Sequence, residues 1–165
     1  MKIAIGYSSK TGNTRMLAEA IEAALPQNMC STCGMFDAKT AEAEFIFAGF
    51  WTDKGNCDES CGKFLETLHS KKLFLFGTAG FGEDHIYFER ILSNVKTHID
   101  ASNQVVDTYM CQGKMPLSVK ARYEAMQAEQ PTQMKQMIAN FDKAMSHPDV
   151  DDLALLAQKV QMLSL

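Results

Sequence analysis

Short apolar runs alternate with amphipathic segments along the first two thirds of this chain, and this alternation constrains its fold more than any other feature. Continuous apolar runs of this kind are typical of strands that are buried on both faces. The expected strands are Lys2–Tyr7, Met29–Phe36, Phe45–Phe50, Lys72–Thr78 and Val105–Cys111. Between them, helical spacing of apolar residues favours helices that pack on the strands. The pattern predicts an α/β fold, with a doubly wound parallel sheet and helices on both faces.

The chain beyond Met115 has a different pattern. Three helical stretches follow one another there, each with a proline near its start, and we expect helices at 117–128, 132–146 and 150–163. No shift in composition marks a linker, and 165 residues are enough for one substantial core. The sequence therefore predicts a single domain, 1–165, in which a helical extension, 115–165, packs on an α/β core formed by 1–114.

Methionine is frequent in this C-terminal region, at Met126, Met134, Met137, Met145 and Met162. Thioether side chains at helical spacing usually fill seams between packed elements, and we favour that interpretation. The alternative is that they form an adaptable surface for a partner protein.

Charge and hydropathy limit the classes of partner. The net charge of −4 disfavours non-specific binding to nucleic acid, and no polybasic patch indicates a membrane surface. The chain starts directly with an expected strand, without a signal-peptide pattern or an apolar run long enough to cross a bilayer. We therefore expect a cytoplasmic protein with neither nucleic-acid nor membrane partners, and a monomer is favoured.

Five cysteines without a secretory signal argue for free thiols. Cys30 and Cys33 are three apart in an expected strand, so their side chains should point to opposite faces and share no metal. Cys57 and Cys61 are four apart at the start of a helix and can lie on one face. Without accompanying His or Asp residues, this second pair is weak support for zinc. We therefore expect structural thiols and no metal site.

The loop Ser8–Thr14 joins the first expected strand to the first expected helix. Most of its side chains carry hydroxyl or amide groups, and Gly12 allows a sharp turn close to a ligand. Together with the unpaired N–H groups of the new helix, they can surround a phosphate. The alternative is a hydroxyl-rich helix cap. The loop matches neither the Walker A motif nor Gly-x-Gly-x-x-Gly, which argues against a P-loop hydrolase and a standard dinucleotide fold.

Three other loops, 51–56, 78–83 and 112–114, also follow expected strands. Ligands of open parallel sheets bind at the carboxyl ends of the strands, so these loops should lie near the phosphate loop. The first two contain aromatic residues, Trp51 and Phe81, which can hold a flat ring between them. A rim or core position is the alternative for Trp51, and Phe81 is equally consistent with a core residue.

These loops carry a resemblance to the flavodoxin family. The segment Ser9-Lys10-Thr11-Gly12-Asn13-Thr14 resembles the FMN phosphate loop of flavodoxins, and 49–55 and 76–83 resemble their two ring-binding loops. The resemblance covers about residues 2–114. It implies the strand order 2-1-3-4-5, for which the family is a standard example, and non-covalent FMN. The FMN-binding residues it implies are Ser9, Lys10, Thr11, Gly12, Asn13 and Thr14 at the phosphate, and Trp51, Thr52, Asp53, Lys54, Gly55, Thr78, Ala79, Gly80, Phe81, Gly82 and Glu83 at the ring.

The resemblance also implies a function, which is to carry electrons one at a time between a reductase and an acceptor enzyme. No general acid or base stands out. One alternative is an FMN-dependent NAD(P)H reductase of a quinone or another small acceptor, with a cavity completed by Gln112, Lys114, Arg122 and Tyr123. The loop Trp51–Gly55 is similar to that of a subgroup in which some members serve a dedicated reductase, including bilirubin reduction in gut bacteria. A third alternative is a binding module that keeps the fold for regulation.

Overall fold

The computed structural model describes residues 1–82 and 84–165. Its elements in chain order are β1 (Ile3–Tyr7), α1 (Asn13–Ala24), β2 (Cys30–Met35), α2 (Ala38–Ala41), β3 (Phe45–Asp53), β4 (Asn56–Cys57), α3 (Glu59–Glu66), β5 (Lys72–Ala79), α4 (His85–Lys96), β6 (Gln104–Gln112), α5 (Leu117–Met126), α6 (Pro131–Ala144) and α7 (Val150–Gln161). Among the described residues, five parallel strands form a sheet in the order β2-β1-β3-β5-β6, and β4 pairs with β3. The expected order 2-1-3-4-5 is therefore confirmed once the short β4 is set aside.

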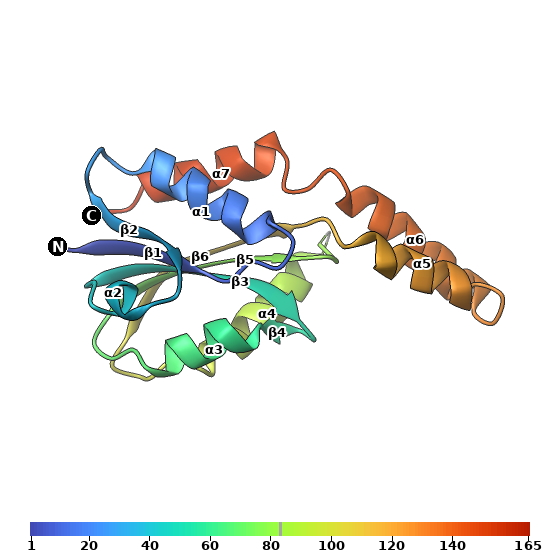
Figure 1. Ribbon diagram of the computed structural model, residues 1–165, viewed down its shortest axis with the longest axis horizontal. Helices are drawn as coiled ribbons and strands as arrows, with labels where there is room; N and C mark the ends of the chain where they lie inside the picture. Colours follow the sequence, from blue (N-terminus) through green and yellow to red (C-terminus); the bar gives the residue numbers. More distant parts are fainter. Residues whose placement is uncertain (83) are drawn as a thin grey trace.

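Helices cover both faces of this sheet, because side chains of each central strand alternate between two cores. On one face α1 and α7 lie together, and Phe47 of β3 packs there with Leu17 and Leu156. On the other face lie α3 and α4, and Ile46 packs with side chains such as Leu65 and Ile91 (Figure 1). The doubly wound α/β class predicted from the alternating pattern is confirmed. No helix in the described part of the chain is both long and apolar enough to cross a bilayer.

The segment expected to be a loop after the third apolar run is a β-hairpin. Strand β3 continues through Asp53 and pairs antiparallel with β4, so that Asp53 lies opposite Asn56. The two residues between them, Lys54 and Gly55, have φ angles of 51° and 77°. Positive φ at both central residues is what a two-residue type I′ turn requires. Trp51 and Thr52 are therefore held in a strand, and the expected loop boundary at Trp51 is wrong.

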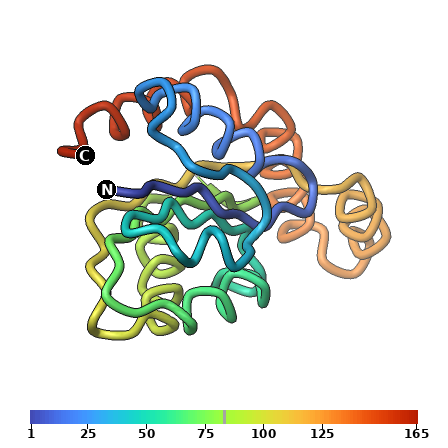
Figure 2. Tube along the Cα trace, turned by 60° about the vertical axis from the view of Figure 1, so that its left-hand side comes forward, coloured from blue at the N-terminus to red at the C-terminus, as the bar shows by residue number. Residues whose placement is uncertain are grey.

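The C-terminal helices have two different roles. Helix α7 packs beside α1 and contributes Leu156 and Val160 to the core on that face. Helices α5 and α6 instead pack against each other and stand away from the sheet, at the end opposite the two chain termini (Figures 1 and 2). This α5–α6 hairpin has a small core of its own around Tyr123, Met134 and Phe141.

The expected methionine packing holds for some positions only. Met134 and Met137 belong to the core of the α5–α6 hairpin. Met126, Met145 and Met162 are exposed, with 37%, 44% and 84% of their surface accessible.

The expectation that Cys30 and Cys33 point to opposite faces is wrong. An irregularity in the pairing of β1 with β2 places Ile3 opposite Cys30 and Ile5 opposite Cys33, so β2 has one extra residue there. The extra residue shifts the alternation, and both thiols pack against the core beneath α1. Burial raises the pKa of both, that of Cys33 to about 12, which disfavours the thiolate form at neutral pH.

Candidate functional site

A cavity of about 530 Å³ lies at the carboxyl ends of β1, β3 and β5. This is the edge of the sheet where ligands of open α/β folds bind. The lining residues come from the loop after β1, the ends of β3 and β5, the segment after β6, and the first turns of α5. They are Lys10, Thr11, Asn13, Trp51, Thr52, Thr78, Ala79, Gly80, Gly113, Lys114, Met115, Pro116, Ser118, Val119 and Arg122. The four segments singled out by the sequence, Ser8–Thr14, 51–56, 78–83 and 112–114, therefore all contribute to one cavity.

The phosphate loop directs backbone N–H groups toward the start of α1. Gly12 precedes this helix with a φ of 91°, a conformation that few other residues adopt. The hydroxyl oxygen of Ser9 accepts hydrogen bonds from the backbone N–H groups of Gly12 (3.1 Å) and Arg15 (3.4 Å). The N-cap residue itself is Gly12, so the hydroxyl cap considered from the sequence is not formed at that position, and Ser9 bonds these N–H groups from within the loop. The N–H groups at the start of α1 thus converge on an oxygen atom of the protein itself.

Two buried side chains tie the phosphate loop to the rest of the site. The hydroxyl of Thr14 donates to the carbonyl oxygen of Phe50 at 3.1 Å, which joins α1 to β3. The amide nitrogen Nδ2 of Asn13 donates to the carbonyl oxygen of Lys114 at 2.8 Å, which joins α1 to the segment after β6. Thr14 therefore acts as a structural tie in this structure, whereas Asn13 also faces the cavity.

Two polar atoms on the cavity wall are buried without a hydrogen-bond partner among the described residues. They are Oδ1 of Asn13 and the hydroxyl oxygen of Thr52. Leaving a buried polar group unpaired costs about 1–3 kcal/mol, and such groups in native proteins usually have a partner. Asn13 is only 6% exposed, so water has little access to its side chain. The residues present therefore fit a polar ligand that supplies an N–H or O–H group here.

Trp51 is held in place from behind. Its backbone N–H donates to the carboxylate of Asp58 at 3.3 Å, and its carbonyl oxygen accepts from the N–H of Asp58 at 3.1 Å. Asp58 also caps α3, so the root of the β3–β4 hairpin is fixed to that helix. The ammonium group of Lys10 lies 5.0 Å from the centroid of the Trp51 ring, a cation–π contact. An indole on the cavity wall, with its backbone fixed in this way, is suited to stacking against a flat ring.

The thiols beside this hairpin are structural. Cys57 and Cys61 are buried in the core beneath α3 and α4. A hydrogen bond from the Cys61 thiol lowers the pKa of Cys57, whereas burial raises the pKa of Cys61. These two residues do lie close together, as their spacing indicated, but they face the core and not the cavity.

Several residues implied by the flavodoxin resemblance lie away from the cavity lining. Ser9, Gly12 and Thr14 stand behind it in the phosphate loop, and Asp53, Lys54 and Gly55 form the tip of the β3–β4 hairpin. The ring of Phe81 contacts Tyr87 edge-on, with centroids 6.4 Å apart. Gly82 lines a second cavity of about 340 Å³. Glu83 lies outside the described residues. The roles expected for these residues at the ring stay predictions.

One wall of the cavity is formed by the segment after β6 and by α5, and the sequence predicted only some of its residues. Of the four residues considered for an acceptor cavity, Lys114 and Arg122 line it. Gln112 instead donates to the carbonyl oxygen of Gly80 at 2.9 Å, and Tyr123 is buried inside the α5–α6 hairpin. The further lining residues Met115, Ser118 and Val119 were missed. The spacing of Ser118, Val119 and Arg122 places them on one face of a helix, and this was the available signal, whereas Met115 precedes the helix.

Comparison with known proteins agrees with this geometry. The family model of the flavodoxin domain matches residues 4–161. The flavodoxin-like domain-containing protein BilS of Clostridium symbiosum (strain WAL-14163) is 39% identical over 93% of this chain and 91% of that protein. Oxidised flavodoxin 2 from Bacillus cereus shares the fold, with a TM-score of 0.55 and 17% identity over 97% of this chain and 95% of that structure.

A flavoprotein from Lactobacillus acidophilus, crystallised in complex with FMN, also shares the fold. Its TM-score is 0.52, with 14% identity over 67% of this chain and 93% of that structure. At these identities the structural likeness concerns the fold alone. The match of the flavodoxin domain to nearly the whole chain goes further, and it shows that this chain belongs to the flavodoxin family.

Proposed function

We propose that this protein binds FMN non-covalently in the cavity and carries electrons one at a time between a reductase and an acceptor enzyme. The observation that carries the proposal is a pair of buried polar atoms without a partner among the described residues, on Asn13 and Thr52, two residues that line one cavity at the carboxyl ends of the strands. Membership of the flavodoxin family and the FMN held by a protein of the same fold give the ligand its chemistry.

Under this proposal, different residues bind the phosphate and the ring of FMN. Backbone N–H groups at the start of α1 and the hydroxyl of Thr11 bind the phosphate. Asn13 and Thr52 hydrogen-bond polar groups of the flavin, and Trp51 stacks against its ring. The bound flavin supplies a ring that accepts and releases electrons, while the protein orients it and sets its surroundings. Lys10 brings positive charge to this ring, and a nearby cation stabilises the charge gained on reduction.

The test is a titration of the purified protein with FMN, followed by anaerobic reduction with dithionite. We expect saturable binding with quenched flavin fluorescence, and reduction in two separate one-electron stages. A protein that takes up no FMN would refute the cofactor. The donor and acceptor are then sought by adding candidate reductases, with reduction of the bound flavin as the signal.

The second candidate function is an FMN-dependent reductase of a quinone or another small acceptor. It is favoured by the contribution of α5 to the cavity wall, because Ser118, Val119 and Arg122 can enclose a small molecule. Steady oxidation of NADPH or NADH by the protein alone with a quinone would support it. Reduction that requires an added reductase protein would support the carrier.

A further inference from the structure

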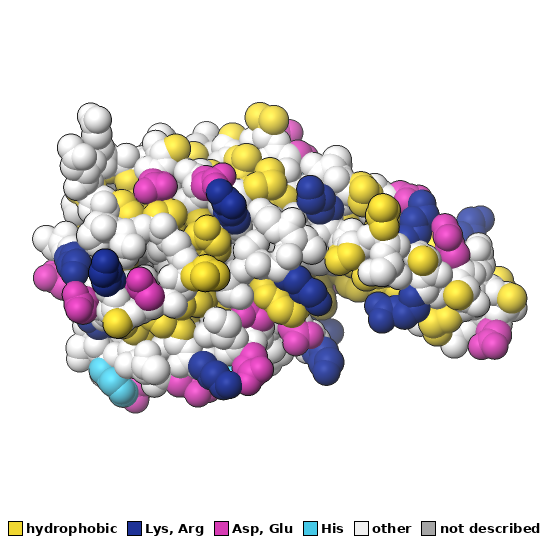
Figure 3. Space-filling view, viewed as in Figure 1, with side chains coloured by type: hydrophobic (Ala, Val, Ile, Leu, Met, Phe, Trp, Pro, Cys, Tyr) yellow, Lys and Arg dark blue, Asp and Glu magenta, His cyan; other side chains and the backbone are white. Residues whose placement is uncertain are grey.

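Positive charge gathers on the walls of the cavity, although the chain as a whole has a net charge of −4. Lys10, Lys114 and Arg122 line it, and no Asp or Glu among the described residues does. Several Lys and Arg side chains lie over the projecting α5–α6 hairpin in Figure 3. A cavity lined by cations without acidic residues attracts an anion.

Lys114 is fixed beside the first residue of α1. Its carbonyl oxygen accepts from Nδ2 of Asn13 at 2.8 Å, and its N–H donates to the carbonyl oxygen of His147 at 2.9 Å. Gly113 allows this approach, since a Cβ at that position would lie 2.5 Å from Nδ2 of Asn13. The backbone of Lys114 is thus anchored on both sides, next to the helix end where an anion binds.

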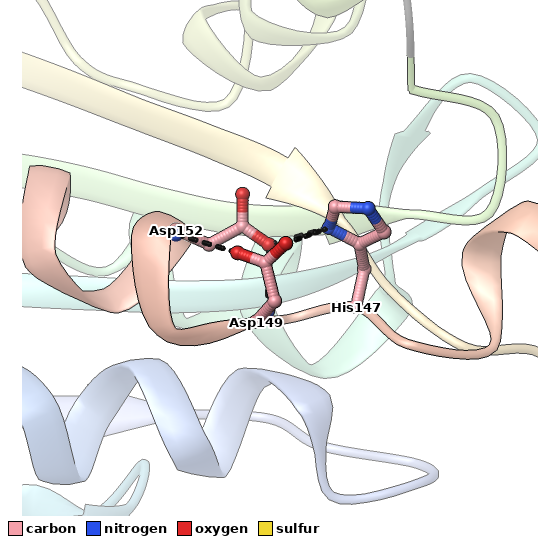
Figure 4. A group of neighbouring side chains, drawn as sticks. All are labelled: His147, Asp149 and Asp152. Carbon is pink, nitrogen blue, oxygen red and sulfur yellow. Dashed lines mark hydrogen bonds and ion pairs between the residues drawn. The ribbon is translucent and has the colours of Figure 1, made fainter.

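His147, whose carbonyl oxygen accepts from the N–H of Lys114, is itself held by neighbouring side chains. Nδ1 of His147 lies 2.6 Å from Oδ2 of Asp152 and 3.6 Å from Oδ2 of Asp149 (Figure 4). The side chain of Asp149 caps α7 by accepting from the N–H of Asp152, and Asp152 accepts in return from the N–H of Asp149. Because these atoms bond one another, we interpret the group as a clasp at the start of α7. Through its carbonyl oxygen, His147 then positions Lys114.

Arg122 lines the same cavity from helix α5. In the part of the chain that the structure describes, neither Arg122 nor Lys114 forms a salt bridge. Lys120 on the same helix is used differently, since it pairs with Asp142 at 2.8 Å and lies over the ring of Phe141. The guanidinium of Arg122 is always charged, and its planar fork fits a phosphate. These two cations are therefore left for a ligand.

We propose that Lys114 and Arg122 form a cationic subsite for the phosphate group of the flavin, by which this protein selects FMN over riboflavin. The inference rests on the proposed function. A phosphate monoester carries about −1.5 to −2 charges at pH 7. The phosphate loop Ser8–Thr14 has one charged residue, Lys10, and its ammonium group lies over Trp51. The compensating charge comes from the segment after β6 and from α5.

This arrangement has a consequence for the α5–α6 hairpin. Asn140 of α6 donates to the carbonyl oxygen of Gly80 at 3.0 Å, which attaches the hairpin at its base. A phosphate held between the start of α1 and Arg122 adds an attachment on α5. FMN should therefore attach the hairpin to the sheet more firmly than riboflavin does.

The experiment measures the dissociation constants of FMN and riboflavin for the wild type, Lys114→Gln, Arg122→Gln and the control Lys135→Gln. Lys135 is an exposed cation on α6 outside the cavity lining. We expect each cavity variant to bind FMN about tenfold more weakly, the size of one charge-assisted hydrogen bond, with riboflavin unchanged. Lys135→Gln should leave both constants unchanged, and Lys114→Arg should keep the preference for FMN. In hydrogen exchange at saturating flavin, FMN should protect α5 more than riboflavin does.

Three results would overturn the subsite. The first is an unchanged ratio of the two dissociation constants in both cavity variants. The second is an equal loss of both flavins, which indicates a structural role. The third is a wild type that binds both flavins equally well. A wild type that binds neither flavin would instead refute the proposed function, and the subsite with it, so the two failures are distinguishable.

Discussion

The two walls of the cavity are built in different ways. One wall consists of strand ends and the start of α1, where backbone pairing within the sheet and the bonds of Thr14 and Asp58 fix each residue. The other consists of the first turns of α5, which belongs to a hairpin with a small separate core. The fixed wall offers hydrogen-bonding atoms and an indole, and the hairpin wall offers charge. Under the proposed function, the sheet therefore positions the ligand and α5 adds charge to its surroundings.

The largest expected effect comes from removing a buried ring from the core behind each wall. Phe141→Ala removes a ring that is 1% exposed in the hairpin, and Phe74→Ala removes a fully buried ring beneath the sheet. Each change should cost about 3–5 kcal/mol. For Phe74→Ala this loss should appear in the free energy of global unfolding. For Phe141→Ala it should appear as lost hydrogen-exchange protection in α5 and α6, while β1 and β3 stay protected.

The same pair of variants also tests the ligand. Because Arg122 needs a folded α5, Phe141→Ala should weaken FMN binding without weakening riboflavin binding. Equal loss of protection along the whole chain in Phe141→Ala would contradict the division into two walls, since hairpin and sheet would then unfold as one unit.

A smaller effect is expected at the aromatic residue of the fixed wall. Trp51→Ala should weaken FMN binding by about 1.4 kcal/mol, a tenfold rise in the dissociation constant, because stacking on the ring is lost. The matched variant is Phe81→Ala, since the flavodoxin resemblance gives both aromatics the same role. Phe81 contacts Tyr87 outside the cavity lining, so its removal should change the dissociation constant less. If Phe81→Ala has the larger effect, the ring lies nearer the β5–α4 loop than the cavity indicates.

The fixed wall was largely predictable from the sequence, because local patterns determine it. Buried apolar runs give the strands, and their ends bring Asn13, Trp51 and Thr78 to one edge of the sheet. The hairpin at Trp51–Asn56 was missed because Lys54 at a positive φ is not a usual turn signal.

The second wall depends on contacts between residues far apart in the chain, and such contacts leave little local pattern. The base of the α5–α6 hairpin is attached to the sheet by the bond of Asn140 to Gly80, sixty residues away in the chain. The shared face of Cys30 and Cys33 likewise follows from the register of β2 against β1, which a single strand does not reveal.

The smallest expected effect is that of Thr52→Val, which should stabilise the flavin-free protein but weaken FMN binding. This opposition makes it the sharpest test of the fixed wall. In the flavin-free protein, Thr52→Val removes a buried hydroxyl that has no partner among the described residues. Its loss should raise the free energy of unfolding by about 1 kcal/mol, since the cost of an unpaired polar group disappears. With FMN bound, the hydroxyl has a partner, so the same change should raise the dissociation constant about fivefold. Thr14→Val is the matched control, since its hydroxyl donates to Phe50 and its loss should destabilise the flavin-free protein. If Thr52→Val destabilises it as well, the hydroxyl of Thr52 is already satisfied, and the fixed wall is not prepared for a polar ligand.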